Sequence, residues 1–403
     1  MRVDLLDNPI RPYSWGSRMA IADLLGRPVP APHPEAELWM GAHPGDPSRA
    51  GGESLVDVLA QDPDGQLGAA VAARWDGRLP FLLKVLAAEE PLSLQAHPSA
   101  EQAAEGYARE EARGIARDAG NRNYPDPTPK PELLCALTEF HALAGFRDPH
   151  RTVELLQAVS TPGLGPYVDL LAGEQNRDGL RALFTTWITL PQPAIDGLLP
   201  DLLDECVLHV KEHGPFELEC RTVLELGESY PGDAGVLAAL LLNRLVLQPG
   251  EAIFLPAGNL HSYLHGAGVE ILANSDNVLR GGLTPKHVDV PELLRVLDFS
   301  VGDMPVLRGE RTGRRWVYPV PVPEFELSRL EWAAGEAEEV HLPGGLPQIL
   351  ICTRGAVGVL PDGGVERELP RGRSLWIPAS DPKITIRPLE GAGAQAFLAT
   401  VGS

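Results

Sequence analysis

The spacing of apolar residues changes twice along this 403-residue chain. Residues 1 to about 150 contain short apolar runs, such as PFLLKVL at 80–86, separated by closely spaced Gly and Pro, which predicts an all-β unit. Between 151 and 243, apolar residues recur every three or four positions, which predicts amphipathic helices. The β pattern returns at 244, where Pro249-Gly250 marks a turn between two short strands. The simplest arrangement is therefore a β-barrel interrupted by a helical insertion.

Composition and charge narrow the class of protein. A chain of this length is too long for one core, so two or three domains are expected. No segment approaches the run of about 18 apolar residues that a membrane span needs. A formal net charge of −21 argues against nucleic acid or an anionic membrane as a partner. An anionic substrate would need a local basic pocket.

The start of the chain and its cysteines bear on location. Asp4 and Asp7 stand where a signal peptide would have its apolar stretch, so we expect no export signal. The four cysteines are isolated and form no C-x-x-C pair, which is typical of free thiols in a reducing compartment. We therefore expect a cytoplasmic protein.

Four separated side chains could be collected by one metal ion. They are Gln95 and His97 in SLQAHPS, Glu132 in PKPELL, and His261 in LPAGNLHSY. In a strand, a Q-x-H pair places both side chains on one face. Two imidazoles, a carboxylate and an amide oxygen suit zinc first, and then other divalent first-row metals. We expect one Zn²⁺ per chain. The alternatives are structural histidines in loops and, for Gln95, an amide that orients His97.

The last hundred residues have the pattern of a second β unit. GEAIFLPA (250–257) and GRSLWIPA (372–379) share Gly, five residues, and then Pro-Ala. The position that matches His261 is Lys383. We interpret the C-terminal region as a decayed copy of the barrel that has kept its strands and lost its metal ligand.

Six segments, in the same order, resemble the type I mannose-6-phosphate isomerase family: YSWGS (13–17), ELWMGAHP (37–44), SLQAHPS (93–99), KPELLCAL (130–137), PAGNLHSY (256–263) and SDNVLRGGLTPKHVDV (275–290). The resemblance runs from about residue 10 to 290. It implies a zinc-dependent cupin (jelly-roll) enzyme that interconverts mannose 6-phosphate and fructose 6-phosphate. It also implies that the metal ligands are Gln95, His97, Glu132 and His261, and that the catalytic arginine is Arg280.

The resulting fold class is mainly β with an α insertion. We expect a catalytic cupin domain at 1–150 plus 244–300, a helical insertion domain at 151–243, and a degenerate, jelly-roll-like cupin at 301–403. The chain departs from the family in one place. Pro129 stands where the family usually has a histidine that is sometimes given a ring-opening role, and proline has no group to titrate.

Aldose–ketose isomerisation also needs a phosphate grip and a stabiliser for the enediolate. Arg280 could face either charge with its planar fork of donors; the alternative is a surface ion pair. Lys84 interrupts the apolar run FLLKVLA, so it must find a partner or extend to water. Ser93, Lys84 and Lys286 are the candidate substrate contacts. Lys130, two residues before Glu132, joins Arg280 as a catalytic candidate.

The remaining catalytic role to assign is that of the general base. Glu270 lies in the apolar segment GVEILA, where burial would raise a carboxyl pKa toward a useful value. Its alternative role is a buried partner for a lysine or arginine. Asp276 is a second candidate, although SDN is equally good turn chemistry. His33 and His43 lie in loops rich in Pro and Gly, and we expect both to face solvent.

Together these features predict a cytoplasmic, monomeric sugar-phosphate isomerase that binds a small-molecule sugar phosphate and neither nucleic acid nor membrane. Two alternatives remain. One is another cupin enzyme, either an epimerase or a dioxygenase; oxygenases favour iron held by histidine-rich sets, which Gln95 and the basic residues argue against. The other is a non-catalytic sugar-binding or structural cupin.

Overall fold

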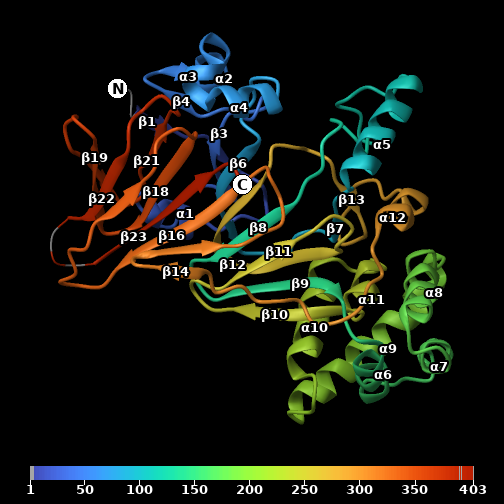
Figure 1. Ribbon diagram of the computed structural model, residues 1–403. Helices are drawn as coiled ribbons and strands as arrows, with labels where there is room; N and C mark the ends of the chain where they lie inside the picture. Colours follow the sequence, from blue (N-terminus) through green and yellow to red (C-terminus); the bar gives the residue numbers. More distant parts are fainter. Residues whose placement is uncertain (1–3, 390, 392, 403) are drawn as a thin grey trace.

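The computed structural model describes residues 4–389, 391 and 393–402. A large antiparallel sheet occupies the middle of the molecule, with most of the helices at one end and the C-terminal strands at the other (Figure 1). No helix among the described residues has the length and apolar character needed to cross a membrane.

The middle sheet has ten strands, and its main path runs β10-β9-β12-β6-β3-β2. Its strands are β2 (Ile10–Arg11), β3 (Glu37–Gly41), β6 (Phe81–Ala88), β7 (Gln95–Ala96), β8 (Glu132–Ala136), β9 (Phe140–Phe146), β10 (Leu242–Leu247), β11 (Ala252–Leu255), β12 (His261–Ala273) and β13 (Leu279–Arg280). The 13-residue strand β12 pairs with β6, β7, β8 and β9. Because β12 touches all four, it brings segments together that lie far apart in the sequence.

A helical block separates two strands that are neighbours in this sheet. The helices are α6 (Pro149–Ala158), α7 (Gly165–Gly173), α8 (Arg177–Ile188), α9 (Gln192–Lys211), α10 (Glu217–Ser229) and α11 (Gly235–Ala239). They connect the end of β9 to the start of β10, where Phe146 and Leu242 are register partners. Phe184 of α8 packs edge-on against Phe146, with ring centroids 5.6 Å apart. The predicted helical insertion is confirmed, and the β9–β10 ladder continues beyond it with one register shift between Leu242 and Asn243.

Residues 1–150 are not all β: besides the short helix α1 (Ala20–Leu24), that expectation is wrong for two longer stretches. The first holds α2 (Leu55–Gln61), α3 (Pro63–Leu67) and α4 (Ala69–Arg74), and the second is α5 (Ala100–Ala112). Side-chain caps mark the start of one helix in each stretch. Asp62 accepts a hydrogen bond from the Gly65 amide at the start of α3, and Ser99 forms a capping box with Gln102 at the start of α5. One further short helix is α12 (Val290–Val296).

The C-terminal strands form a nine-stranded sheet, ordered β14-β15-β16-β23-β18-β21-β1-β4-β5, and a four-stranded sheet, ordered β17-β22-β19-β20. Their bounds are β14 (Glu310–Thr312), β15 (Arg315–Tyr318), β16 (Glu326–Trp332), β17 (Val340–Leu342), β18 (Gln348–Arg354), β19 (Ala356–Pro361), β20 (Arg367–Pro370), β21 (Ser374–Ile377), β22 (Ile384–Pro388) and β23 (Ala394–Thr400). Three N-terminal strands, β1 (Asp4–Asp7), β4 (Arg49–Ala50) and β5 (Glu53–Ser54), complete the larger sheet. The N-terminal segment is thus built into the C-terminal sheet.

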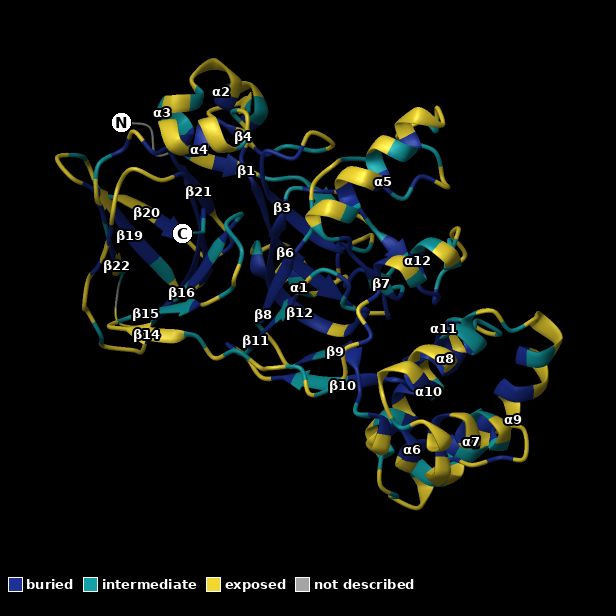
Figure 2. Ribbon diagram, turned by 45° about the vertical axis from the view of Figure 1, so that its right-hand side comes forward, coloured by how far each residue is buried: buried dark blue, intermediate teal, exposed yellow. Residues whose placement is uncertain are grey.

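The two segments of the proposed repeat have matching structure. In each, the strand begins two residues after the glycine, giving β11 (252–255) and β21 (374–377). Both glycines adopt positive φ, +88° at Gly250 and +79° at Gly372, a conformation that glycine adopts without strain. The core formed by the C-terminal strands contains apolar side chains such as Trp332, Ile377 and Ile386. Burial differs among the C-terminal strands: β21 is buried throughout, whereas β14 is exposed, as is an outer face of α5 (Figure 2).

Candidate metal centre and its surroundings

Three buried side chains meet where three strands begin or end. His97 follows β7, Glu132 begins β8, and His261 begins β12. Their candidate ligand atoms all lie within 4.8 Å of one another. His97 Nε2 is 3.2 Å from Glu132 Oε1, and His261 Nε2 is 3.4 Å from Glu132 Oε2. Gln95 is the register partner of His261, so the structure brings all four predicted ligands together.

Backbone carbonyls fix the protonation of both imidazole rings. His97 Nδ1 lies 2.8 Å from the carbonyl oxygen of Asn277, and His261 Nδ1 lies 3.0 Å from that of Asn259. A carbonyl oxygen only accepts hydrogen bonds, so each Nδ1 carries the proton and donates it. In the neutral rings, each Nε2 lone pair is therefore directed toward the Glu132 carboxylate.

The charges of His97 and Glu132 do not match, because at pH 7 the carboxylate is ionised and the imidazole is neutral. Burial lowers the pKa of His97 to about 4, so the ring is neutral at pH 7. His97 Nε2 is buried without a hydrogen-bond partner, although Glu132 is close. Burial alone would raise the pKa of Glu132, but His97 and Lys130 outweigh it and keep that pKa well below its usual range. Two lone pairs and a carboxylate pointing at one another fit a divalent cation.

A cavity of about 50 Å³ adjoins this cluster. It is lined by Glu37, Lys84, Leu86, Leu92, Gln95, Lys130, Glu132, His261, Ser262, Tyr263 and Glu270. Lys130 Nζ lies 3.3 Å from Glu132 Oε1. The cavity thus combines the candidate metal ligands with groups that can hold and transfer protons.

Lys84 points inward rather than toward water. Its ammonium is 3.3 Å from Glu37 Oε1 and 3.4 Å from Glu270 Oε2. Burial alone would lower the pKa of Lys84, but Glu37 and Glu270 outweigh it, so the pKa is raised and the ammonium stays charged. Lys84 has therefore found buried partners instead of extending to solvent.

Glu270 is buried as expected. Burial raises the pKa of its carboxyl to about 7, with Lys84 opposing and Glu132 and Glu37 reinforcing the rise. The Tyr263 hydroxyl donates a hydrogen bond to Glu270 Oε1 at 2.9 Å. Glu270 is therefore placed both to act as a base and to pair with Lys84. Neither Glu37 nor Tyr263 was among the sequence candidates, because only the β3–β6–β12 pairing places them here.

Arg280 lies on β13, opposite Gln95 in the register with β7. Burial lowers the pKa of its guanidinium. Among the residues that the structure describes, no carboxylate lies within 4.0 Å of it, so the surface ion pair that we considered is not formed. Lys286 is exposed, and burial, followed by the positive charge of Arg280, lowers the pKa of its ammonium. Arg280 and Lys286 are therefore two neighbouring cations.

Two predicted contacts lie outside the lining of the 50 Å³ cavity: Ser93 and Lys286. Ser93 is partly buried, two residues before Gln95. The loop carrying Pro129 is tied to the loop at 275–277, because Asn277 Nδ2 donates to the Thr128 carbonyl oxygen at 2.7 Å. Proline at 129 leaves that loop without an imidazole next to Lys130.

His43 is the clearest correction. We expected it to face solvent, but its side chain is only 8 % exposed, and its Nε2 lies 3.2 Å from Asp276 Oδ1. The His43 ring packs edge-on against the Trp39 indole, with centroids 4.8 Å apart. The neighbouring Gly and Pro suggested an open loop, but the loop folds back over the end of the buried strand β3.

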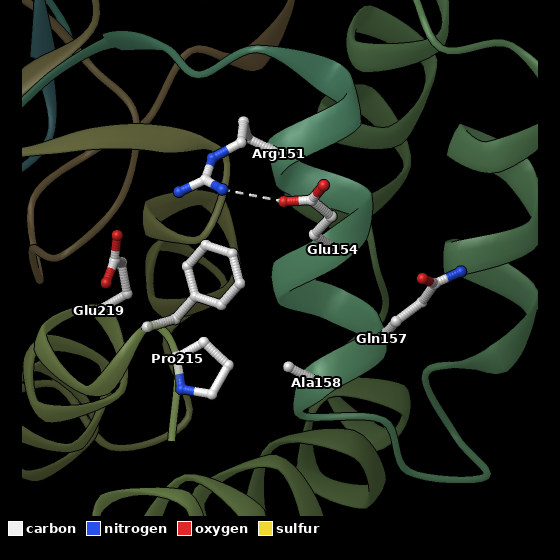
Figure 3. Close-up of a pocket in the computed structure, with 7 residues that line it drawn as sticks. Arg151, Glu154, Gln157, Ala158, Pro215 and Glu219 are labelled. Carbon is white, nitrogen blue, oxygen red and sulfur yellow. Dashed lines mark hydrogen bonds and ion pairs between the residues drawn. The ribbon is translucent and has the colours of Figure 1, made fainter. Parts of the chain in front are cut away.

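A larger hollow of about 610 Å³ lies elsewhere, between α6 and α10. Figure 3 shows Arg151 and Glu154 projecting toward it from α6, with Glu219 facing them from α10. Arg151 is paired with Glu154 at 3.0 Å, and both side chains are more than half exposed. This hollow offers no converging ligands, and the chemistry is concentrated at the His97–Glu132–His261 cluster.

The protein has a cupin-like β core, and His97, Glu132 and His261 lie where its strands begin or end. This combination places the protein in the class of metal-dependent cupins. The family model described as phosphomannose isomerase type I, catalytic domain, matches residues 4–149. Mannose-6-phosphate isomerase of Escherichia coli (strain K12) is 38% identical over 389 residues, covering 95% of this chain and 96% of that protein. The human mannose-6-phosphate isomerase is 32% identical over 416 residues, covering 94% of each.

A solved structure agrees with these relatives. Mannose 6-phosphate isomerase from Salmonella typhimurium, bound to fructose 6-phosphate and zinc, superposes with a TM-score of 0.88 at 34% identity, covering 100% of both chains. The chain therefore belongs to the type I phosphomannose isomerase family. The predicted family and fold class are confirmed.

Proposed function

We propose that this protein is a metal-dependent aldose–ketose isomerase that interconverts mannose 6-phosphate and fructose 6-phosphate. The observation that carries the proposal is the buried His97–Glu132–His261 cluster, whose Nε2 lone pairs converge on a carboxylate beside a cavity containing Lys130 and Glu270. The proposal is supported by relatives that share the whole fold and are mannose-6-phosphate isomerases.

His97, Glu132 and His261, joined by Gln95, would hold one Zn²⁺. The bound ion supplies Lewis acidity, which polarises the substrate carbonyl and the neighbouring hydroxyl and is worth several kcal/mol. The Asn277 and Asn259 carbonyls orient the two imidazoles for this task. Arg280 and Lys286 supply the local positive charge that an anionic substrate needs near a protein of net charge −21.

Proton transfer falls to Glu270 in this proposal. As a carboxylate it takes the proton from C2 of the open-chain mannose 6-phosphate, and the electron pair moves onto the carbonyl oxygen to give an enediolate. The hydroxyl proton on O2 passes to the negatively charged O1, the protonated Glu270 returns its proton to C1, and the carbonyl forms at C2. A pKa of about 7 suits both halves of this exchange at neutral pH. The Tyr263 hydroxyl orients the carboxylate, and we assign the stabilisation of the developing negative charge to Arg280, the register partner of Gln95.

The direct test is incubation of zinc-loaded protein with mannose 6-phosphate in deuterated water. Fructose 6-phosphate carrying deuterium at C1 is the expected product, because a proton held on Glu270 exchanges with solvent. Product without deuterium would keep the isomerisation but argue for shielded proton transfer or a hydride shift. Absence of fructose 6-phosphate would reject the proposed function. Oxygen uptake, measured alongside, would detect a cupin dioxygenase.

We further propose a monomer located in the cytoplasm, whose ligand is a small sugar phosphate. The four buried free cysteines suit a reducing compartment, and the net charge of −21 disfavours nucleic acid and anionic membranes. Size-exclusion chromatography with light scattering tests the monomer. A mass of about twice 43.3 kDa would reject it.

A further inference from the structure

The proposed mechanism gives no role to His43, a buried residue that packs on Trp39, whose ring centroid lies 5.2 Å from the Lys84 ammonium of the cavity. His43 follows β3, and its ring is held edge-on against Trp39. The backbone amide of Gly45 lies 3.1 Å from His43 Nδ1. An amide N–H can only donate, so Nδ1 is the acceptor and carries no proton. The neutral ring therefore carries its proton on Nε2, the atom that faces Asp276.

The contact with Asp276 is consequently a directed hydrogen bond. His43 Nε2–H points at Asp276 Oδ1 across 3.2 Å. This hydrogen bond is the main reason that the pKa of Asp276 is lowered; burial opposes it, and the positive charges of Lys130 and Lys84 add to it. Asp276 is thus an ionised carboxylate close enough to both lysines of the cavity to feel their charge. Its side chain is still 59% exposed, which leaves oxygen lone pairs free for a ligand.

The backbone around Asp276 is fixed as firmly as its side chain. The Asp276 amide donates to Asp126 Oδ2 at 2.8 Å. The next residue, Asn277, donates its side-chain amide to Thr128 and accepts the Nδ1–H of His97 through its carbonyl oxygen. One loop therefore joins the metal ligand His97, the segment before Lys130, and His43.

We propose that His43 is a positioning residue, which holds the Asp276 carboxylate beside the cavity as a hydrogen-bond acceptor for a hydroxyl group of the sugar phosphate. This inference rests on the proposed function. His43 itself does not touch the substrate. It acts by restricting Asp276 to one orientation, so that the hydroxyl group is bound without an ordering step at each turnover.

The experiment compares two substitutions of His43. A glutamine amide nitrogen reaches the place of Nε2, so His43→Gln keeps a donor toward Asp276. An asparagine reaches only the place of Nδ1, so His43→Asn keeps the Gly45 contact and loses the Asp276 contact. We expect His43→Asn to lower kcat/KM for mannose 6-phosphate by about tenfold or more, as for loss of a hydrogen bond to a charged group. His43→Gln should retain most of the activity. His33→Gln, at an exposed position in the loop before β3, is the matched control.

A double-variant cycle separates positioning from general stability. In an Asp276→Asn background, His43→Asn should cause little further loss, because the group that it positions is already altered. Equal activities of His43→Asn and His43→Gln, or an undiminished loss in the Asp276→Asn background, would overturn the proposal. Circular dichroism and zinc content verify that each variant is folded and loaded.

If His43→Asn does not fold, the test rests on Asp276→Asn alone, because the exposed Asp276 side chain tolerates replacement. Turnover by Asp276→Asn equal to that of the unaltered protein would overturn the role proposed for His43 and Asp276. An unaltered protein that fails to convert mannose 6-phosphate would instead reject the proposed function. The two failures are therefore distinguishable.

Discussion

Lys84 and Glu270 are register partners in the β6–β12 ladder, and their side chains form an ion pair of 3.4 Å in the interior of the sheet. Both side chains are less than a tenth exposed. The same ammonium lies 3.3 Å from Glu37 on β3, so three adjacent strands each contribute one charge. One lysine thus balances two buried carboxylates, and this explains why a charge interrupts the apolar strand β6.

This balance predicts the effect of Lys84→Met on stability. The substitution leaves Glu37 and Glu270 buried without a counter-charge, and breaking a buried ion pair by removing one partner costs about 3 kcal/mol or more. We expect that loss in the free energy of unfolding, measured by urea denaturation at pH 7. Lys211→Met, at an exposed helix end, is the control and should change stability by less than about 1 kcal/mol. An effect of Lys84→Met as small as that would contradict the shared-charge interpretation.

The proposed metal centre predicts that replacing His261 weakens zinc binding, whereas replacing His265 on the same strand does not. His261→Ala removes a candidate ligand, whereas His265→Ala changes an exposed residue on the same strand. Ligand binding to the folded state stabilises it by about 2.7 kcal/mol at a concentration one hundred times the Kd. We expect zinc to raise the thermal midpoint of the unaltered protein and of His265→Ala, and to have much less effect on His261→Ala. Atomic emission should show the same order of zinc content. Equal zinc binding by both variants would remove His261 from the ligand set.

The role proposed for Arg280 predicts that replacing this residue lowers turnover without lowering the zinc content. Removing one donor that faces a developing oxyanion lowers kcat by about 10² to 10³. We expect Arg280→Ala to show such a loss in coupled assays with mannose 6-phosphate, and Arg280→Lys to recover part of it, because lysine keeps the charge but not the planar fork. Zinc content should be unchanged in both. Near-normal turnover of Arg280→Ala would reject its catalytic role.

The sequence was informative where a residue's own chemistry or a regular period carried the signal. Apolar residues at helical spacing predicted the helical block correctly, because helix formation depends mainly on neighbours along the chain. Four ligand-type residues predicted a shared site, and the structure brings Gln95, His97, Glu132 and His261 together. Their metal-binding role stays a prediction until the metal is measured.

The sequence was least informative about contacts between residues that lie far apart along the chain. Nothing local to residues 4–7 indicates pairing with Trp376 and Leu375, which creates a single sheet from both ends of the chain. The ion pairs of Lys84 depend on the order of β3, β6 and β12, which no single segment specifies. His43 was misjudged for the same reason, because Asp276, more than 230 residues away, makes its environment. Register, rather than residue type, determines these contacts.

The pKa of Glu270 predicts how stability depends on pH. Burial raises this pKa from 4.5 to about 7 in the folded protein. Between these values the folded state binds a proton that the unfolded chain releases, so the contribution of Glu270 to stability is fully present below pH 4.5 and is lost as the pH rises through 7. A shift of this size corresponds to an upper limit of about 3 kcal/mol. Glu270→Gln removes the titration and keeps an oxygen to accept from Tyr263.

The expected result is a difference that grows with pH. In metal-free protein, the free energy of unfolding of Glu270→Gln should increase relative to that of the unaltered protein from pH 5 through pH 7, and the difference should level off about one pH unit above the folded-state pKa. Urea denaturation at half-unit intervals of pH measures it. Glu90→Gln, at an exposed position after β6, serves as the control and should give a flat difference. A difference for Glu270→Gln that is flat or falls with pH would show that Lys84, and not burial, governs this carboxyl, because the ion pair would then keep Glu270 ionised throughout the range.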